Sequence, residues 1–377
     1  MPNMIKPLQA KIRKIDVFPL NIPLSEPFVI SLETITHAEN ILVRITAGNG
    51  MAGYGECSPY RRIAGETQAS GLAVAPLLAK VLTGKNPLEI QSCIQAMDLA
   101  IAGNRCIKSA FDMALYDLAA RLLDLPLYQY LGGQNAKPLH TDMTVSMLEP
   151  EEMAKAALRF KANGFPAIKL KLGGGFPIDV ERVKTVREAI GPGLPIRVDA
   201  NQAWDLPTAI RVLRAIAPFG VQFCEQPVAA HAYLDLPYLR QQSPIPIMAD
   251  ESLFDHIDAA RLIRLQACDL FNIKLSKAGG IHHAVKIVHL AEAAGIACQV
   301  GCFSETRIGM SALAHFALAF DNIRYFDLDA PLMLSEDPVV GGLEYHPGGR
   351  ITVPDSPGIG AVPDDAFLQA LVSIPLS

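Results

Sequence analysis

The strongest indication of the fold is the segment Ile168-Lys169-Leu170-Lys171-Leu172. Its apolar residues alternate with two lysines, so in a β-strand the apolar side chains fall on one face and the lysines on the other. Lys171 stands at the carboxyl end of this strand, and a helical pattern follows it. A strand, a terminal charge and a helix together form one βα unit, the repeating element of parallel α/β folds.

The same unit recurs along the middle of the chain at nearly even intervals. Each short apolar run closes on a charged residue, and a helical pattern follows. The closing residues are Lys171, Asp199, Glu225, Asp250 and Lys274. Further strands are predicted near residues 141–146, 296–301 and 323–329, which brings the number of strands to eight. The chain is therefore predicted to be an α/β protein built on a modified TIM barrel, (β/α)7β, with its chemistry at the carboxyl ends of the strands.

At 377 residues the chain is longer than a minimal barrel by more than about a hundred residues, and most of the surplus precedes residue 140. Strand patterns at 11–20, 39–46 and 53–56 and helical patterns at 67–82, 87–97 and 104–123 predict an N-terminal α+β capping domain. The turn Gly48-Asn49-Gly50 marks a hairpin between the second and third of these strands. We therefore divide the chain into a cap at 1–134, a catalytic barrel at 135–342, and a C-terminal segment at 343–377 that packs back on the cap.

Residues 22–36, between the first two cap strands, show little regular pattern. A loop of this length inside a compact domain is more often a functional lid than a simple connection. We predict an irregular lid here.

The composition excludes several classes of protein. Half of the residues are hydrophobic and 19% are charged, which excludes a disordered chain or a coiled coil. The net charge is −5 with no basic cluster, so nucleic acid is not an expected partner. No apolar run reaches membrane-spanning length, and charges interrupt residues 1–14, where a secretion signal needs an apolar block. We expect a cytoplasmic protein with no membrane partner. Its seven cysteines lack Cys-x-x-Cys pairs and are expected to be core residues.

Three carboxylates are predicted to meet at the top of the barrel. Asp199, Glu225 and Asp250 close three successive strands. So many buried charges are too costly to retain without a metal or a substrate. An all-oxygen set suits Mg²⁺ first and Mn²⁺ second, whereas Zn²⁺ would favour His or Cys ligands.

Lys171 and Lys274 come from strands roughly opposite each other across the barrel mouth. Ammonium groups near a divalent cation are expected to have a lowered pKa, which suits a general base. A substrate carboxylate bound to the metal would place its α-carbon between the two lysines. Removal of the α-proton gives an enediolate that the cation stabilises.

Five motifs taken together resemble the muconate-lactonizing branch of the enolase superfamily. They are Lys169-x-Lys171, Asp199-x-Asn201, Glu225-Gln226-Pro227, Asp250-Glu251-Ser252, and Asn272-Ile273-Lys274 followed by Gly279-Gly280. The resemblance covers nearly the whole chain, and enzymes of this superfamily use a Lys or His base together with Mg²⁺. It implies an enolase-like cap whose segments 22–36 and 53–66 close over the barrel and determine specificity. We also expect a homo-oligomer.

The last barrel strand is the most informative within that branch. Asp327-x-Asp329 resembles the signature of dipeptide epimerases, in which paired carboxylates hold the free α-ammonium of the substrate. The resemblance implies epimerisation of a dipeptide at the α-carbon of its second residue. It also implies substrate contacts from Thr144, Lys169, Cys302 and Ser304, with support from Asn201, Glu251 and Glu305.

One position departs from the pattern of Ala-Glu epimerases. Where their mobile loop carries an Arg for the glutamate side chain, this chain has Glu33. An acid there would repel an acidic substrate, so cationic or uncharged dipeptides are expected instead of Ala-Glu. Arg61 and Arg62 lie in the neighbouring loop and complicate this inference.

Other functions remain open on the sequence. N-acylamino acid racemases, o-succinylbenzoate synthases and muconate cycloisomerases of the same branch share the lysines and the metal ligands, but they do not need Asp327 and Asp329. A binding protein without catalysis is disfavoured because Lys171 and Lys274 are intact. A metal-dependent hydrolase is disfavoured because histidine ligands are missing.

Overall fold

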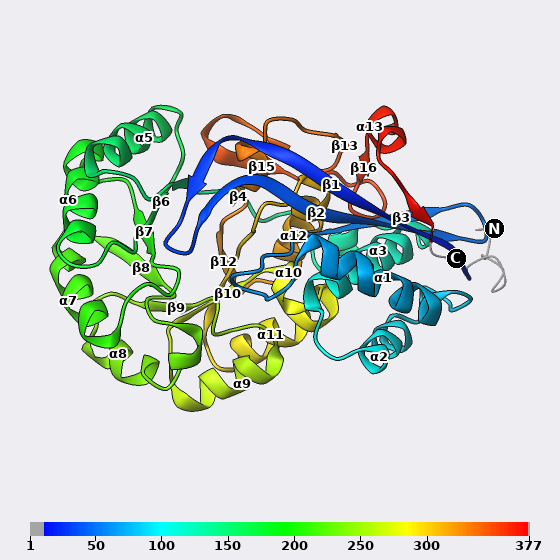
Figure 1. Ribbon diagram of the computed structural model, residues 1–377, viewed down its shortest axis with the longest axis horizontal. Coiled ribbons are helices and arrows are strands. Elements are labelled where there is room, and N and C mark those ends of the chain that lie inside the picture. The colour runs from blue at the N-terminus through cyan, green and yellow to red at the C-terminus, as the bar shows by residue number, and fades with distance from the viewer. Residues whose placement is uncertain (1–10, 376–377) are drawn as a thin grey trace.

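The computed structural model describes residues 11–375; residues 376–377 and residues 1–10, which include most of the segment tested above for a secretion signal, lie outside it. The larger part is one curled sheet of eight parallel strands ringed by helices (Figure 1). The strands are β5 (Met143–Val145), β6 (Ile168–Lys171), β7 (Ile196–Asp199), β8 (Val221–Glu225), β9 (Ile247–Ala249), β10 (Leu270–Ile273), β11 (Ala297–Val300) and β12 (Ile323–Phe326). They are neighbours in the sheet in the order in which they occur in the chain. The predicted (β/α)7β barrel is confirmed.

Helices connect these strands and cover the outside of the sheet. They are α5 (Pro150–Ala162), α6 (Ile178–Ile190), α7 (Leu206–Ile216), α8 (Leu236–Gln242), α9 (His256–Leu265), α10 (Leu275–Ala278), α11 (Ile281–Ala293) and α12 (Arg307–Ala319). In the register of the sheet Lys171 is paired with Asp199, and Asp199 with Glu225, so the charged strand ends stand at one level. The first and last strands meet where the N–H of Asp142 donates to the carbonyl of Phe326 at 3.2 Å.

The residues before the barrel form an antiparallel sheet with helices against it (Figure 1). Its elements are β1 (Ile12–Val29), β2 (Thr34–Ala47), β3 (Ala52–Cys57), α1 (Gln68–Leu82), α2 (Ile90–Ala100) and α3 (Arg105–Leu122). Glycines of β3 allow α3 to approach closely, since a Cβ on Gly55 would lie 2.1 Å from the carbonyl oxygen of Ala110. From α3, the carboxylate of Asp112 accepts a hydrogen bond from the N–H of Ile281, the first residue of α11, at 2.6 Å. The cap is therefore joined to the barrel through buried polar contacts.

The prediction that residues 22–36 form an irregular loop was wrong. β1 continues to Val29 and β2 begins at Thr34, so most of this segment is a two-stranded ribbon. The pairing register shifts between Pro23 and Phe28, and this irregularity breaks the alternation on which the strand prediction depends. The ribbon extends from the cap across the barrel mouth (Figure 1).

The remaining elements connect the two parts. They are α4 (Leu127–Tyr130), β4 (Leu139–His140), β13 (Val339–Gly341), β14 (Glu344–Tyr345), β15 (Arg350–Thr352), β16 (Ala361–Pro363), α13 (Asp365–Ala370) and β17 (Ile374–Pro375). β17 pairs antiparallel with β1, with Ile374 opposite Val17, so the described chain ends in the cap sheet. No helix within residues 11–375 is both long and apolar enough to span a bilayer.

Candidate active site

Three carboxylates stand next to one another at the carboxyl ends of neighbouring barrel strands. Asp199 ends β7, Glu225 ends β8 and Asp250 directly follows β9. None of the three is accessible to solvent. Because an ionised carboxylate is costly to bury without a counter-charge, cations must lie close to each of them.

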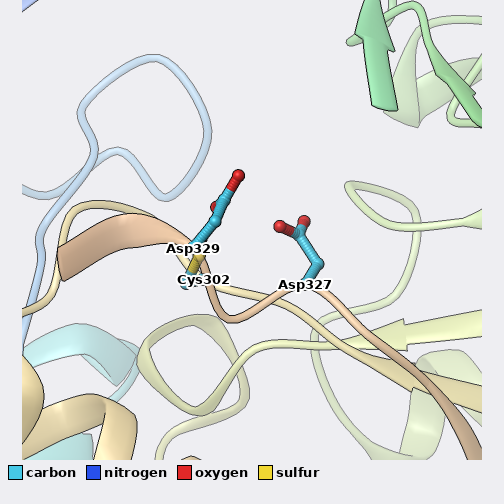
Figure 2. Close-up of side chains that lie close together, drawn as sticks. All are labelled: Cys302, Asp327 and Asp329. Carbon is cyan, nitrogen blue, oxygen red and sulfur yellow. Dashed lines mark hydrogen bonds between the residues drawn. The ribbon is translucent and has the colours of Figure 1, made fainter. Parts of the chain in front are cut away.

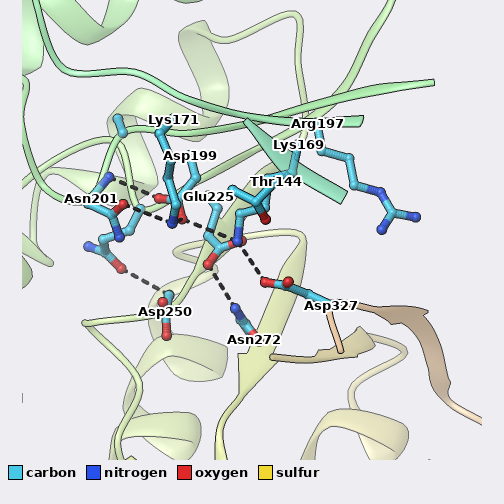
Figure 3. A network of polar contacts seen from close by, with 12 residues as sticks. Thr144, Lys169, Lys171, Arg197, Asp199, Asn201, Glu225, Asp250, Asn272 and Asp327 are labelled. Atoms are coloured by element: carbon cyan, nitrogen blue, oxygen red, sulfur yellow. Dashed lines mark hydrogen bonds and ion pairs between the residues drawn. The ribbon is translucent and has the colours of Figure 1, made fainter. Parts of the chain in front are cut away.

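Lysines provide these charges (Figure 3). Lys171, the last residue of β6, lies 2.6 Å from Asp199 and donates to the side-chain oxygen of Asn201 at 3.0 Å. Lys274, which follows β10, lies 2.8 Å from Asp250. The two lysines come from strands on opposite sides of the barrel, so the structure brings together the predicted bases and the predicted ligands.

Lys169 lies deeper, at the centre of the same network (Figure 3). Its ammonium group lies 2.9 Å from Glu225, 3.2 Å from Asp199 and 2.9 Å from Asp327. Asn272 donates a further hydrogen bond to Glu225 at 2.8 Å. Lys169 is therefore held by three carboxylates, whereas Lys171 and Lys274 are each paired with one.

Lys171 and Lys274 both line a cavity of about 280 Å³ between the cap and the barrel. An aromatic ring faces each ammonium group. The ring centroid of Phe28, in β1, is 5.9 Å from Lys171, and that of Phe303, after β11, is 4.7 Å from Lys274. Both distances lie within the range of a cation–π contact.

A second carboxylate pair, Asp327 and Asp329, is drawn with Cys302 in Figure 2. The pair lines a smaller adjoining cavity of about 40 Å³ that the two lysines also border. Asp327 is paired with Lys169, whereas Asp329 accepts a hydrogen bond from the N–H of Thr144 at 2.8 Å. Cys302 lies 3.7 Å from Asp329. Within residues 11–375 Cys302, Asp327 and Asp329 form the one group of three or more Cys, His, Asp or Glu side chains whose ligand atoms lie within 4.8 Å of one another, and Asp199, Glu225 and Asp250 are spaced more widely. The predicted substrate contacts Thr144 and Cys302 thus adjoin the Asp-x-Asp pair.

Burial and neighbouring charge shift the acidities at the site. Burial, together with Asp199, raises the pKa of Glu225 to about 7, and burial next to Asp250 raises the pKa of Glu251 to about 8. Burial alone would lower the pKa of Lys274, but Asp250 and Glu225 outweigh it and raise that pKa. A lowered lysine pKa was predicted from the sequence, and that prediction presupposes a divalent cation beside the amine. With the carboxylates alone around it, the pKa of Lys274 is raised instead.

The donor set fits a hard divalent cation. Asp199, Glu225 and Asp250 offer oxygen ligands only, which is the preference of Mg²⁺. Both carboxylate oxygens of Asp250 and Oε2 of Glu251 are buried without a hydrogen bond of good geometry. The oxygens of Asp250 instead lie 2.8 and 2.9 Å from the ammonium groups of Lys274 and Lys277. The carboxylate oxygens that a metal would need are therefore paired with lysine ammonium groups.

The predicted supporting residues lie around this centre. Asn201 donates to Glu251 at 3.1 Å. Glu305 accepts hydrogen bonds from the Ser276 hydroxyl and from the N–H of Phe303, both at 2.7 Å. It therefore holds the loop that carries Phe303. Ser304 lines both cavities.

Glu33 lies at the tip of the β1–β2 ribbon and lines the larger cavity. Arg61 lies 2.6 Å from it. The carboxylate that was predicted to face the substrate side chain therefore has a cation beside it, from one of the two arginines that complicated the prediction. Arg61 is itself largely exposed, at 68%.

Sequence reasoning missed several residues. Lys277 is 1% exposed and contacts Asp250, yet in the sequence it is one more lysine near a helix start. Gln299 donates to Glu225 at 3.2 Å. Phe28 lies in the predicted specificity segment 22–36, and Phe303 lies between the predicted contacts Cys302 and Ser304, so both segments were predicted although neither ring was. For Gln299 the inward parity of β11 was an available signal, and for Lys277 the sequence offers none.

Comparisons with known proteins agree with this geometry. Residues 12–132 match the family model of the mandelate racemase / muconate lactonizing enzyme N-terminal domain, and residues 152–367 match that of the enolase C-terminal domain-like family. A D-Ala-D/L-Ala epimerase of Cytophaga hutchinsonii is 48% identical over 96% of this chain and 99% of its own length. A hydrophobic dipeptide epimerase of Enterococcus faecalis is 40% identical over 93% of this chain and 99% of its own.

A crystal structure of the dipeptide epimerase from Cytophaga hutchinsonii, complexed with Mg and the dipeptide D-Ala-L-Val, superposes with a TM-score of 0.96 and covers 97% of this chain and 100% of that one. At these identities both the fold and the family are shared. The chain belongs to the mandelate racemase / muconate lactonizing enzyme family of the enolase superfamily, within its group of dipeptide epimerases, and is an isomerase of the racemase and epimerase class.

Proposed function

We propose that this chain uses Mg²⁺ to epimerise dipeptides with uncharged side chains at the α-carbon of their second residue. The observation that carries the proposal is the placement of Lys171 and Lys274 on opposite sides of one cavity, with Asp329 in the adjoining space. Two amines on opposite faces of one carbon allow a proton to leave from one face and return to the other.

Asp199, Glu225 and Asp250 would hold the metal, and Mn²⁺ would fit the same oxygen ligands. When bound, the cation would stabilise the negative charge that develops on the substrate carboxylate as the enediolate forms. Lys169, fixed by three carboxylates, keeps a positive charge close to those oxygens throughout the reaction.

The two lysines act in opposite protonation states. For one stereoisomer, neutral Lys171 removes the α-proton and the ammonium group of Lys274 returns a proton to the opposite face. For the other stereoisomer the roles reverse. Phe28 and Phe303 keep bulk water away from these amines, which limits loss of the transferred proton to solvent.

Asp329 is suited to receive the substrate's free ammonium group. Asp327 is paired with Lys169, whereas the contacts of Asp329 are hydrogen-bond donors and not a cation. Burial and then the charge of Asp327 raise the pKa of Asp329, and an ammonium group of the substrate beside it would stabilise its ionised form. This requirement for a free amine separates dipeptides from N-acylated amino acids.

The larger cavity favours an uncharged substrate side chain. Of the two expected classes, cationic side chains would need an unpaired acid, and Glu33 is paired with Arg61. Phe28, Ile63 and Phe303 add apolar surface to the lining. The names of the relatives support the same class, since one acts on hydrophobic dipeptides and another on D-Ala-D/L-Ala.

Incubating the protein with Mg²⁺ and dipeptide libraries in D₂O tests the proposal. We expect one deuteron to replace the proton on the α-carbon of the second residue, with L-Ala-L-Ala and L-Ala-L-Leu types leading. A chelator should abolish the exchange. Exchange in N-acetylated dipeptides at the rate of the free ones would favour N-acylamino acid racemisation instead. Absence of exchange in every free dipeptide would refute the proposal.

A further inference from the structure

Lys277 is a buried charge to which the mechanism above gives no part. It lies in α10, three residues after Lys274, and is 1% exposed. Its ammonium group donates to the carbonyls of Asp250, Leu253 and Asn272 at 2.6, 2.5 and 2.9 Å. It also lies 2.9 Å from Oδ1 of Asp250. A lysine buried with four oxygen partners is a fixed element of the structure and not a solvated charge.

These contacts join the ends of two strands beyond the point where their ladder stops. The pairing of β9 with β10 ends at Ala249 and Phe271. Asp250 and Lys274 both lie past that point, so the main-chain ladder between β9 and β10 does not fix their separation. Lys277 bridges the gap, since its donors reach the carbonyls of Asp250 and Asn272.

The carboxylate of Asp250 lies between two lysines. Oδ2 is 2.8 Å from Lys274 and Oδ1 is 2.9 Å from Lys277. Lys277 therefore sets the plane of this carboxylate, and the carboxylate in turn sets the position of the Lys274 amine. On the other side, Lys169 also lies near the partner of Lys171, but it contacts the same oxygen, Oδ2 of Asp199, as Lys171 does. Oδ1 of Asp199 accepts the N–H of Asn201 at 2.9 Å, so no second lysine holds that oxygen as Lys277 holds Oδ1 of Asp250.

We propose that Lys277 is a positioning residue for one half of the reaction: it holds Asp250 and the end of β10 so that Lys274 reaches the α-carbon. The inference rests on the proposed two-lysine mechanism. It predicts that loss of Lys277 impairs proton transfer by Lys274 far more than proton transfer by Lys171, whereas a purely structural residue would affect both equally.

The test measures exchange of the second-residue α-proton in D₂O by NMR, separately for L-Ala-L-Ala and L-Ala-D-Ala, in the Mg²⁺-loaded full-length protein. Lys171→Ala and Lys274→Ala first assign one stereoisomer to each lysine. If neither variant shows such selectivity, the proposed function fails and not this inference alone. If both do, Lys277→Met is measured against that reference.

Lys137→Met is the matched control. Lys137 also donates to three main-chain carbonyls, those of Ala317, Phe320 and Ile323, at 2.9, 2.6 and 3.2 Å. It lies at the amino end of β12, away from the strand ends that carry the site. Its loss should reduce stability while leaving the ratio of the two exchange rates unchanged.

For Lys277→Met we expect the exchange assigned to Lys274 to fall at least tenfold more than the exchange assigned to Lys171. Lys277→Arg, which keeps the charge but is too wide for the same four oxygens, should show the same asymmetry and serves if the methionine variant does not fold. A crystal structure of either variant without metal should show Asp250 moved from its contact with Lys274. An equal fall in both exchange rates, or an unmoved Asp250, would overturn the inference.

Discussion

The surroundings of Lys171 differ from those of Lys274 in their origin. Lys171 is covered from the cap, where Phe28 of the β1–β2 ribbon faces its amine. Lys274 has barrel residues as its nearest partners, with Asp250 at 2.8 Å and Phe303 facing its amine, and the cap reaches it through Tyr60, whose ring centroid lies 5.7 Å from that of Phe303. A movement of the β1–β2 ribbon would therefore disturb Lys171 directly and Lys274 only through other residues.

The tip of the β1–β2 ribbon contacts the loop after β7, next to Lys171. The hydroxyl of Ser31 donates to the carbonyls of Ala200 and Asn201 at 3.1 and 3.0 Å. Gly173 leaves room for it, because a Cβ there would lie 2.5 Å from the Cβ of Ser31. The ribbon thus touches the same strand end that orients Lys171 through Asn201.

The largest effects should come from removing each base. Lys171→Ala and Lys274→Ala should each lower net epimerisation by about 1,000-fold or more, since a positioned general base contributes roughly 10²–10⁴-fold. Each variant should still exchange the α-proton of one stereoisomer, and the two variants should retain opposite ones. NMR in D₂O with both epimers measures this. If either variant interconverted the two epimers at a near-native rate, the lysine that it lacks would not be a base.

Asp329→Asn should lower the reaction rates that depend on Lys171 and on Lys274 equally. The carboxylate lies in the adjoining cavity and contacts neither lysine among its hydrogen bonds. Loss of a charge-assisted contact with the substrate ammonium group should lower kcat/KM for free dipeptides by roughly 10–100-fold. Steady-state kinetics should show equal losses in both directions of the reaction. A loss confined to one direction would instead place Asp329 within one half of the site.

Gly173→Ala should impair proton transfer by Lys171 more than proton transfer by Lys274. The new methyl group would meet Ser31, and the backbone at φ +144° disfavours any residue with a Cβ. We expect about a tenfold fall in the exchange that depends on Lys171, with less than a threefold change in the exchange that depends on Lys274. Ser31→Ala, which loses only the hydroxyl contacts, should show the same direction with a smaller, few-fold effect. Equal changes in the two exchange rates would mean that docking of the ribbon does not act through Lys171.

The barrel and the cluster at its mouth could be predicted from the sequence because both follow from a local rule. Every unit repeats a strand, a charge and a helix, and parallel strands bring their carboxyl ends to one level. The ribbon at residues 22–36 escaped prediction because its register shift breaks the alternation.

The contacts that sequence reasoning missed join residues that only the folded chain brings together. Lys277 follows Lys274 by three residues, as many solvated lysines do, and only its burial against two strand ends distinguishes it. The pairing of Glu33 with Arg61 joins residues 28 apart in different loops. The sign of the pKa shift at Lys274 likewise depends on which charges surround the amine, and the sequence alone does not give those distances.

The smallest expected effect concerns Glu33 and Arg61, which belong to the cap side of the cavity. Glu33→Gln would leave Arg61 without its counter-charge, so L-Ala-L-Glu should gain relative to L-Ala-L-Leu. Arg61→Met would leave Glu33 unpaired, so L-Ala-L-Lys should gain instead. Both shifts in relative kcat/KM should be only about two- to fivefold, because Arg61 is exposed and water screens its charge. The two variants control for each other: they remove opposite charges from one pair, so a side chain bound beside that pair must respond in opposite directions. Shifts in the same direction would show that the substrate side chain lies elsewhere in the cavity, and the preference for uncharged dipeptides would then depend on the apolar lining alone.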